Sequence, residues 1–291
     1  MSSAALVFQK SKWPTFKIFS LLLLAVPFAT ESSVGVFFDK QVIQPFLLLL
    51  VAPIFYALFR RENPVWALIA ASVPAGVATG AINLTAPLVT MQTADEAMAS
   101  PVVYSPIALG LILSYSLRVI APAYQSESQK PGVIGLFNCL IVTFACITAF
   151  LIQNVEGYEI FLSQQALMFA LAITLCCFAF NDKARLIFSK VMARAGLMIC
   201  LLAAVYAVTL YTTAAASADL REVGPVLATS QILMGYGALI LIAASASGER
   251  PAEDRDLLTR DWHLTEAYVF ITLIVFPPQT LLELSRELMG V

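Results

Sequence analysis

The chain has 291 residues, of which 59% are hydrophobic and only 12% are charged, and its mean hydropathy is +0.83. A typical soluble domain carries about 25% charged residues, so a soluble fold of this composition would leave too much apolar surface in water. The net charge of −2 gives no sign of the basic surface that nucleic-acid binding requires, so no nucleic-acid partner is predicted. The composition therefore predicts a membrane protein whose main partner is the lipid bilayer.

Apolar runs of about 20 residues, the length that crosses a bilayer, recur along the chain. Nine are predicted, over residues 16–30, 42–59, 65–90, 102–121, 133–153, 160–180, 193–215, 223–246 and 266–285. The backbone in lipid must bond within its own segment, and the runs are continuously apolar rather than alternating, so they are helices and not barrel strands. The first run has the charged start of a secretory signal, but no small-residue cleavage site follows Phe28. We read it as a retained helix, which makes the fold an all-α polytopic transmembrane bundle.

The basic residues predict how these spans are oriented. With nine spans, 14 of the 17 Lys and Arg residues fall on one side of the membrane, and only Lys40, Arg221 and Arg286 fall on the other. Cytoplasmic loops carry the excess of Lys and Arg. We therefore expect an amino terminus in the cytoplasm, a carboxyl terminus on the opposite face, and residence in the cell (inner) membrane.

The polar segments divide the chain into two halves. Residues 1–121 form a first half with four spans, residues 122–132 a polar connector, and residues 133–291 a second half with five spans. The connector contains Pro, Gly, Ser and Gln, a composition typical of a flexible hinge.

The residue types that support enzyme chemistry are scarce. The one histidine, His263, lies in a predicted loop, and the five cysteines all lie within spans without zinc-ligand spacing. Every Asp and Glu falls in a loop or at a span end, and neither a phosphate-binding glycine loop nor a nucleophile elbow occurs. These absences predict a protein that is not an enzyme and that carries no metal and no cofactor.

Two spans contain Pro and Gly in similar patterns. The third span carries Pro74 and Gly76 within residues 73–81, and the eighth carries Pro225 within residues 223–231. Pro removes a helical hydrogen bond, so both spans are candidates for interrupted helices. Spans five apart run antiparallel, which is the relation expected of an inverted repeat, and broken helices of this kind mark substrate sites in transporters. The alternative is close helix packing at Gly76 and Gly80, with Pro225 tolerated near the start of its span.

The neutral polar side chains beside these interruptions form the predicted substrate site. Amides and hydroxyls suit a small organic solute, and they can also share a coupling cation with freed backbone carbonyls. The predicted binding residues are Pro74, Gly76, Thr79, Asn83, Thr229, Ser230 and Gln231.

Two short segments carry a resemblance to a known group of carriers. Residues 94–101 (ADEAMASP) are similar to the segment after the first crossing helix of the bile acid–sodium symporter and auxin efflux carrier group. Residues 222–224 (EVG) are similar to the start of the second crossing helix in the symporters. The resemblance implies an elevator-type secondary transporter with its site between two crossing helices.

Three functions are compatible with the sequence. The first is a secondary transporter that moves a small organic solute by alternating access. The second is a non-catalytic integral subunit of a multi-protein membrane complex, whose apolar faces bind other helices or further copies of the chain. The third, a lipid-modifying enzyme, is the weakest, because such chemistry usually needs a cluster of carboxylates or histidines.

Overall fold

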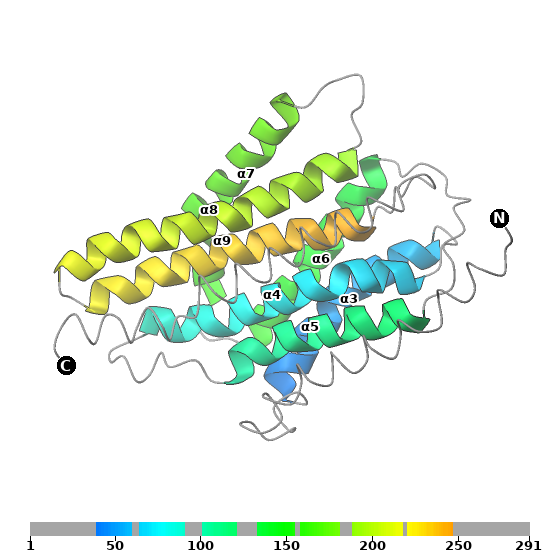
Figure 1. Ribbon diagram of the computed structural model, residues 1–291, viewed down its shortest axis with the longest axis horizontal. Helices are drawn as coiled ribbons and strands as arrows, with labels where there is room; N and C mark the ends of the chain where they lie inside the picture. The colour runs from blue at the N-terminus through cyan, green and yellow to red at the C-terminus, as the bar shows by residue number, and fades with distance from the viewer. Residues whose placement is uncertain are drawn as a thin grey trace, which may run out of the picture.

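The computed structural model describes residues 39–59, 64–90, 101–120, 133–154, 158–180, 188–217 and 220–246. These ranges are helical almost throughout and contain no strand, so the all-α prediction is confirmed for them (Figure 1). The elements are α3 (Lys40–Phe59), α4 (Pro64–Thr90), α5 (Pro101–Ile120), α6 (Val133–Asn154), η2 (Tyr158–Leu162), α7 (Gln164–Ala179), α8 (Phe188–Ser217) and α9 (Leu220–Ala246).

The helices coincide with seven of the predicted spans. The predicted first and ninth spans, residues 16–30 and 266–285, lie outside the described residues. Within the described part, three helices are long and apolar enough to cross a bilayer, over Lys40–Phe59, Pro64–Thr85 and Leu227–Ser245. The coarse prediction of a helical protein that inserts in a membrane is therefore supported.

Local sequence signals set where the helices begin. The Asp39 carboxylate accepts a 2.8 Å hydrogen bond from the backbone N–H of Gln41 and so caps α3. Pro64 occupies the first position of α4, where its missing N–H would have no helical partner. The hydroxyl of Ser163 accepts from the N–H of Ala166 at the start of α7.

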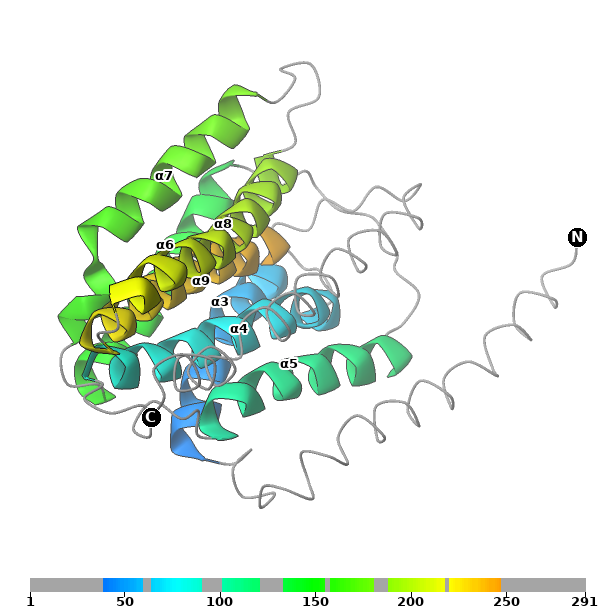
Figure 2. The ribbon, with the colours of Figure 1, turned by 60° about the vertical axis from the view of Figure 1, so that its left-hand side comes forward.

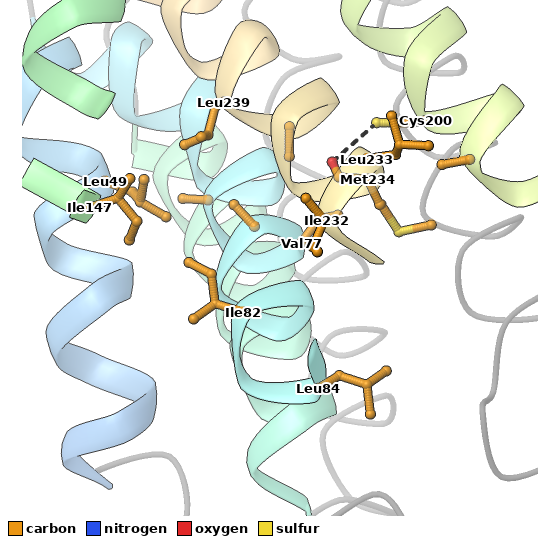
Figure 3. Close-up of a cluster of buried hydrophobic side chains, with 14 of the residues drawn as sticks. Leu49, Val77, Ile82, Leu84, Ile147, Cys200, Ile232, Leu233, Met234 and Leu239 are labelled. Carbon is orange, nitrogen blue, oxygen red and sulfur yellow. Dashed lines mark hydrogen bonds between the residues drawn. The ribbon is translucent and has the colours of Figure 1, made fainter. Parts of the chain in front are cut away.

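Four helices lie side by side in the order α5, α4, α9, α8, and α7 stands apart from this row (Figures 1 and 2). The core lies where α3, α4, α6 and α9 meet, and Leu49, Ile82, Ile147 and Leu239 point into it (Figure 3). Across the α8–α9 contact, the thiol of Cys200 donates to the backbone carbonyl of Met234 at 3.6 Å (Figure 3). The α4–α9 contact therefore lies at the centre of the row, where a site shared by these two helices would be enclosed.

The prediction of two interrupted helices is wrong. Both α4 and α9 are continuous α-helices through Pro74 and Pro225. Pro225 lies in the second turn of α9 and has no N–H to donate. The only backbone carbonyl that loses its helical donor is therefore in the first turn, and the rest of the helix is unaffected. Pro74 is buried between Ser72 and Gly76, where α5 packs closely enough to keep the helix in place. Packing by neighbouring helices is the usual reason that membrane helices tolerate proline.

The order of the helices favours a direct repeat, and the predicted inverted repeat is not supported. Gln164 begins α7 and Phe188 begins α8, each 124 residues after the start of α3 and α4. The third pair is offset, because α9 begins at Leu220, 119 residues after the start of α5 at Pro101. We name α3–α4–α5 the first unit and α7–α8–α9 the second unit. In both units the three helices contact one another, and corresponding helices run in the same direction (Figure 1).

Candidate functional site

A cavity of about 40 Å³ lies at the contact between α4 and α9, beside α6 and η2. The volume is enough for a few water molecules. Most of its lining is apolar. The lining residues are Ala78, Ala81, Ile82 and Thr85 of α4, Phe144, Ile147, Thr148 and Leu151 of α6, Phe161 and Leu162 of η2, and Gln231, Ile232, Gly235, Tyr236 and Leu239 of α9.

Helical spacing explains why these residues share the cavity. Ala78, Ala81 and Thr85 are three and four residues apart, so they lie on one face of α4. Gln231, Gly235 and Leu239 recur every four residues and form the facing side of α9. The small side chains on both faces let the two helices approach closely. A Cβ atom placed on Gly235 would lie 3.9 Å from the Cβ atom of Ala81, an ordinary contact distance.

Two of the polar groups that line the cavity already donate hydrogen bonds. The hydroxyl of Thr85 donates to the Ala81 carbonyl in its own helix at 2.7 Å. The hydroxyl of Tyr236 donates to the backbone carbonyl of Phe161 and so ties η2 to α9. Neither hydroxyl proton is therefore available to a ligand without breaking an existing bond.

Gln231 differs from these groups. The residue is 5% exposed, and it supplies the one amide side chain among the residues that line the cavity. An amide has both donor and acceptor capacity, and it lies in a mostly apolar lining that also contains Thr85, Thr148 and Tyr236.

The structure places the four predicted residues of α4 in different surroundings. Pro74 and Thr79 are buried, and the Thr79 hydroxyl oxygen has no hydrogen-bond partner within the described part of the chain. Gly76 faces α5, since a Cβ atom there would lie 2.9 Å from the Cα atom of Ile107. Asn83 faces α3, where its amide donates to the Gln41 carbonyl at 3.2 Å. None of the four lines the cavity.

Of the three predicted residues on α9, one lines the cavity. The hydroxyl of Thr229 bonds to the Pro225 carbonyl at 2.9 Å, and that of Ser230 bonds to the Leu227 carbonyl at 2.7 Å, both within the helix. Gln231 reaches the cavity. The structure thus brings Gln231 to the α4–α9 contact, and the role of all seven residues in binding stays a prediction.

Sequence reasoning missed the contributions of α6 and η2. Thr148 and Phe144 of α6 and Phe161 of η2 line the cavity, although no sequence motif marks them. The spacing of Ala78, Ala81 and Thr85 was a usable signal, because small residues at helical spacing indicate a close helix contact.

Three buried side-chain oxygen atoms lack a hydrogen-bond partner among the described residues. They are Oε1 of Gln44 on α3, Oγ1 of Thr79 on α4 and Oγ of Ser105 on α5. Buried polar groups are normally hydrogen-bonded, so each of these oxygen atoms can accept a hydrogen bond from a water molecule or another ligand. In the same part of the chain, no group of three or more His, Cys, Asp or Glu residues is placed to bind a metal ion.

No protein-family model, curated protein or solved structure matches this chain.

Proposed function

We propose that this protein is an integral membrane secondary transporter that moves a small organic solute by alternating access, with its site at the cavity between α4 and α9. The observation that carries the proposal is Gln231, which is 5% exposed and supplies the one amide side chain among the residues that line the cavity. A solute with a hydrogen-bonding group would gain a hydrogen bond from this amide. The contact between the two units is also a location where transporters built from repeats place their sites.

The cavity lining favours a particular class of solute. No charged side chain is among the lining residues, and most of them are apolar. A charged solute would be poorly stabilised there, because a low-dielectric site without a counter-charge disfavours ions. The proposed solute is therefore neutral and largely apolar, with one hydrogen-bonding group for Gln231. A cavity of about 40 Å³ is small, so the loaded conformation requires α4 and α9 to move apart.

The membrane arrangement is part of the same proposal. The described helices would be seven of nine spans in the cell (inner) membrane, with the amino terminus cytoplasmic and the carboxyl terminus on the opposite face. The support is the basic-residue partition, in which 14 of 17 Lys and Arg residues fall on one side.

A transport assay on two matched variants tests the proposal. Gln231→Leu keeps the side-chain volume and removes the amide, whereas Ser230→Ala removes a hydroxyl that is bonded within its own helix. Purified protein in liposomes would be offered a panel of neutral, anionic and cationic solutes, with and without sodium and proton gradients. We expect uptake of a neutral solute, about a tenfold loss of affinity in Gln231→Leu from one hydrogen bond, and parental behaviour in Ser230→Ala.

Equal affinities in the parent and Gln231→Leu, or uptake confined to charged solutes, would show that the solute does not bind at this cavity.

Absence of transport for every solute would favour the second candidate, a non-catalytic integral subunit of a multi-protein membrane complex. The specific observation in favour of that candidate is the exposed apolar surface of α7, which includes Met168, Leu171 and Leu175 at 51–59% exposure. Purification from native membranes with stoichiometric foreign subunits would support it.

A further inference from the structure

The cavity between α4 and α9 is not sealed from the surface of the protein. Most of its lining residues are buried, but Phe144 of α6 and Leu162 of η2 are 37% and 50% exposed. Three more lining residues, Thr148, Gly235 and Tyr236, are half-buried. Each of these five residues lines the cavity and also reaches the surface, so together they mark where the cavity opens. We name them the cavity mouth.

The surface around the α6 side of the mouth is apolar. From Ile141 to Ile152, every exposed residue of α6 is apolar, and Ile141, Val142 and Ile152 are 45–61% exposed. Phe144 lies at the middle of α6 (Val133–Asn154). In the proposed membrane arrangement α6 is a span, so its middle lies in the hydrocarbon core, where there is no bulk water. This side of the mouth would therefore open onto lipid chains.

The η2 side of the mouth is polar at its edge. Glu159 of η2 is exposed, and so are Gln164 and Gln165 at the start of α7, on either side of Leu162 in the sequence. An exposed carboxylate is costly in hydrocarbon, so this edge belongs at the level of water or lipid headgroups. The two sides of the mouth thus match the two ends of an amphipathic molecule.

We propose that the solute is a membrane-dissolved amphipath with one hydrocarbon chain and one neutral hydrogen-bonding group, such as a long-chain alcohol, and that it enters the cavity laterally through the mouth. This inference rests on the proposed function and adds the phase from which the solute is taken. The cavity is small, about 40 Å³, which suits a narrow chain better than a bulky ring system. The Glu159 carboxylate beside the mouth would repel an anionic headgroup.

Gln231 gives the site its preference for such a solute over a plain hydrocarbon. A chain that moves from the bilayer into an apolar cavity gains little from the hydrophobic effect, because both surroundings are apolar. A hydroxyl in hydrocarbon has no hydrogen-bond partner, so a bond to the Gln231 amide is a net gain. The same hydroxyl in water would already be hydrogen-bonded, which makes the bilayer the more favourable source.

Photolabelling from within the bilayer tests the route. The purified protein would be reconstituted in phosphatidylcholine vesicles that contain a fraction of phosphatidylcholine with a diazirine near the middle of one acyl chain. This probe stays in the bilayer, so it labels only surfaces that lipid chains reach. We expect label on Ile232 and Gly235, which line the cavity, and on the exposed Ile141. Ala203, which is buried and does not line the cavity, should show only background label.

Two pairs of matched variants make the result specific. Thr148→Trp should close the mouth and lower the label on Ile232 to background, whereas Ala149→Trp, at the adjacent exposed position outside the lining, should keep the parental label. Phe144→Ala should widen the mouth and raise the label on Ile232. Ile141→Ala shortens an exposed side chain that does not line the cavity, so it should leave that label unchanged.

Competition with two small molecules tests the chemical class. Octanol and octane have the same chain, and only octanol carries a hydroxyl. At equal concentrations in the membrane, octanol should displace the label from Ile232 about tenfold more effectively than octane, which corresponds to one hydrogen bond. In Gln231→Leu the two molecules should be equally effective.

The outcomes separate this inference from the proposed function. Label on Ile232 no higher than on Ala203 would overturn lateral entry, and equal displacement by octanol and octane in the parent would overturn the chemical class. Neither measurement depends on transport. A labelled cavity in a protein that transports no solute would contradict the proposed function alone, whereas transport without label in the cavity would contradict the lateral route alone.

Discussion

The side-chain amide of Asn83 donates a hydrogen bond of 3.2 Å to the backbone carbonyl of Gln41. Pro45, four residues after Gln41, has no N–H group, so this carbonyl lacks its usual helical donor. Asn83 on α4 thus replaces a hydrogen bond that α3 cannot make for itself, and it links the two helices at the same time.

This relationship predicts an energetic coupling between Asn83 and Pro45. Asn83→Ala should lower the free energy of unfolding by about 1–3 kcal/mol, because it leaves a carbonyl without a donor. Pro45→Ala restores the N–H of residue 45, so Asn83→Ala should cost about 1 kcal/mol less in that background. Thermal or SDS-induced unfolding of the four proteins of the cycle measures this difference. Additive effects would mean that the Gln41 carbonyl is satisfied by another group.

The close approach of α4 and α5 predicts opposite effects at two glycines. Gly76→Ala would place a Cβ atom 2.9 Å from the Cα atom of Ile107, so the helices must separate, and we expect a loss of about 1–3 kcal/mol in stability. Gly235→Ala meets its nearest neighbour at 3.9 Å and should be neutral or stabilising by up to about 1 kcal/mol, since alanine favours the helix. Unfolding midpoints of the two variants compare them. A more stable Gly76→Ala protein would show that α5 does not pack there.

The hydrogen bond from Tyr236 to the Phe161 carbonyl predicts that Tyr236→Phe loosens η2 beside the cavity. We expect a loss of about 0.5–1.5 kcal/mol in stability and faster hydrogen exchange across residues 158–162. Tyr206→Phe is the matched control, because the Tyr206 hydroxyl makes no hydrogen bond to the other described residues. Hydrogen-exchange mass spectrometry distinguishes them. Equal protection of η2 in the two variants would contradict the role given to Tyr236.

The charge partition predicts which loops a membrane-impermeant maleimide can reach in intact cells. Ser126→Cys and Thr259→Cys lie in predicted cytoplasmic loops and should label no more than the parent. Gly157→Cys lies in the predicted outer loop between the fifth and sixth spans and should label readily. Labelling of all three after the membrane is permeabilised confirms that the cysteines are reactive. Efficient labelling of Ser126→Cys from outside would overturn the nine-span arrangement.

The positions of the described helices were largely predictable from the sequence. Seven of the predicted spans correspond to observed helices, and α4 was expected over residues 65–90 and occurs at Pro64–Thr90. The first and ninth spans, outside the described residues, stay predictions. Helix formation in an apolar chain is local, because every backbone group must bond within its own segment when no water is available. Hydrophobicity and length therefore contain most of the information needed to locate a span.

The sequence by itself determined that this is a helical chain for a membrane, where its helices run, and that neutral polar groups cluster on α4 and α9. Only the tertiary structure decided which way those groups point. Gly76 faces α5, Asn83 faces α3, and Gln231 faces the cavity. The physical reason is that contacts with the neighbouring helices decide whether a proline or a glycine interrupts a helix. Packing by adjacent helices kept α4 and α9 continuous, and it also fixed the rotation of each helix about its own axis.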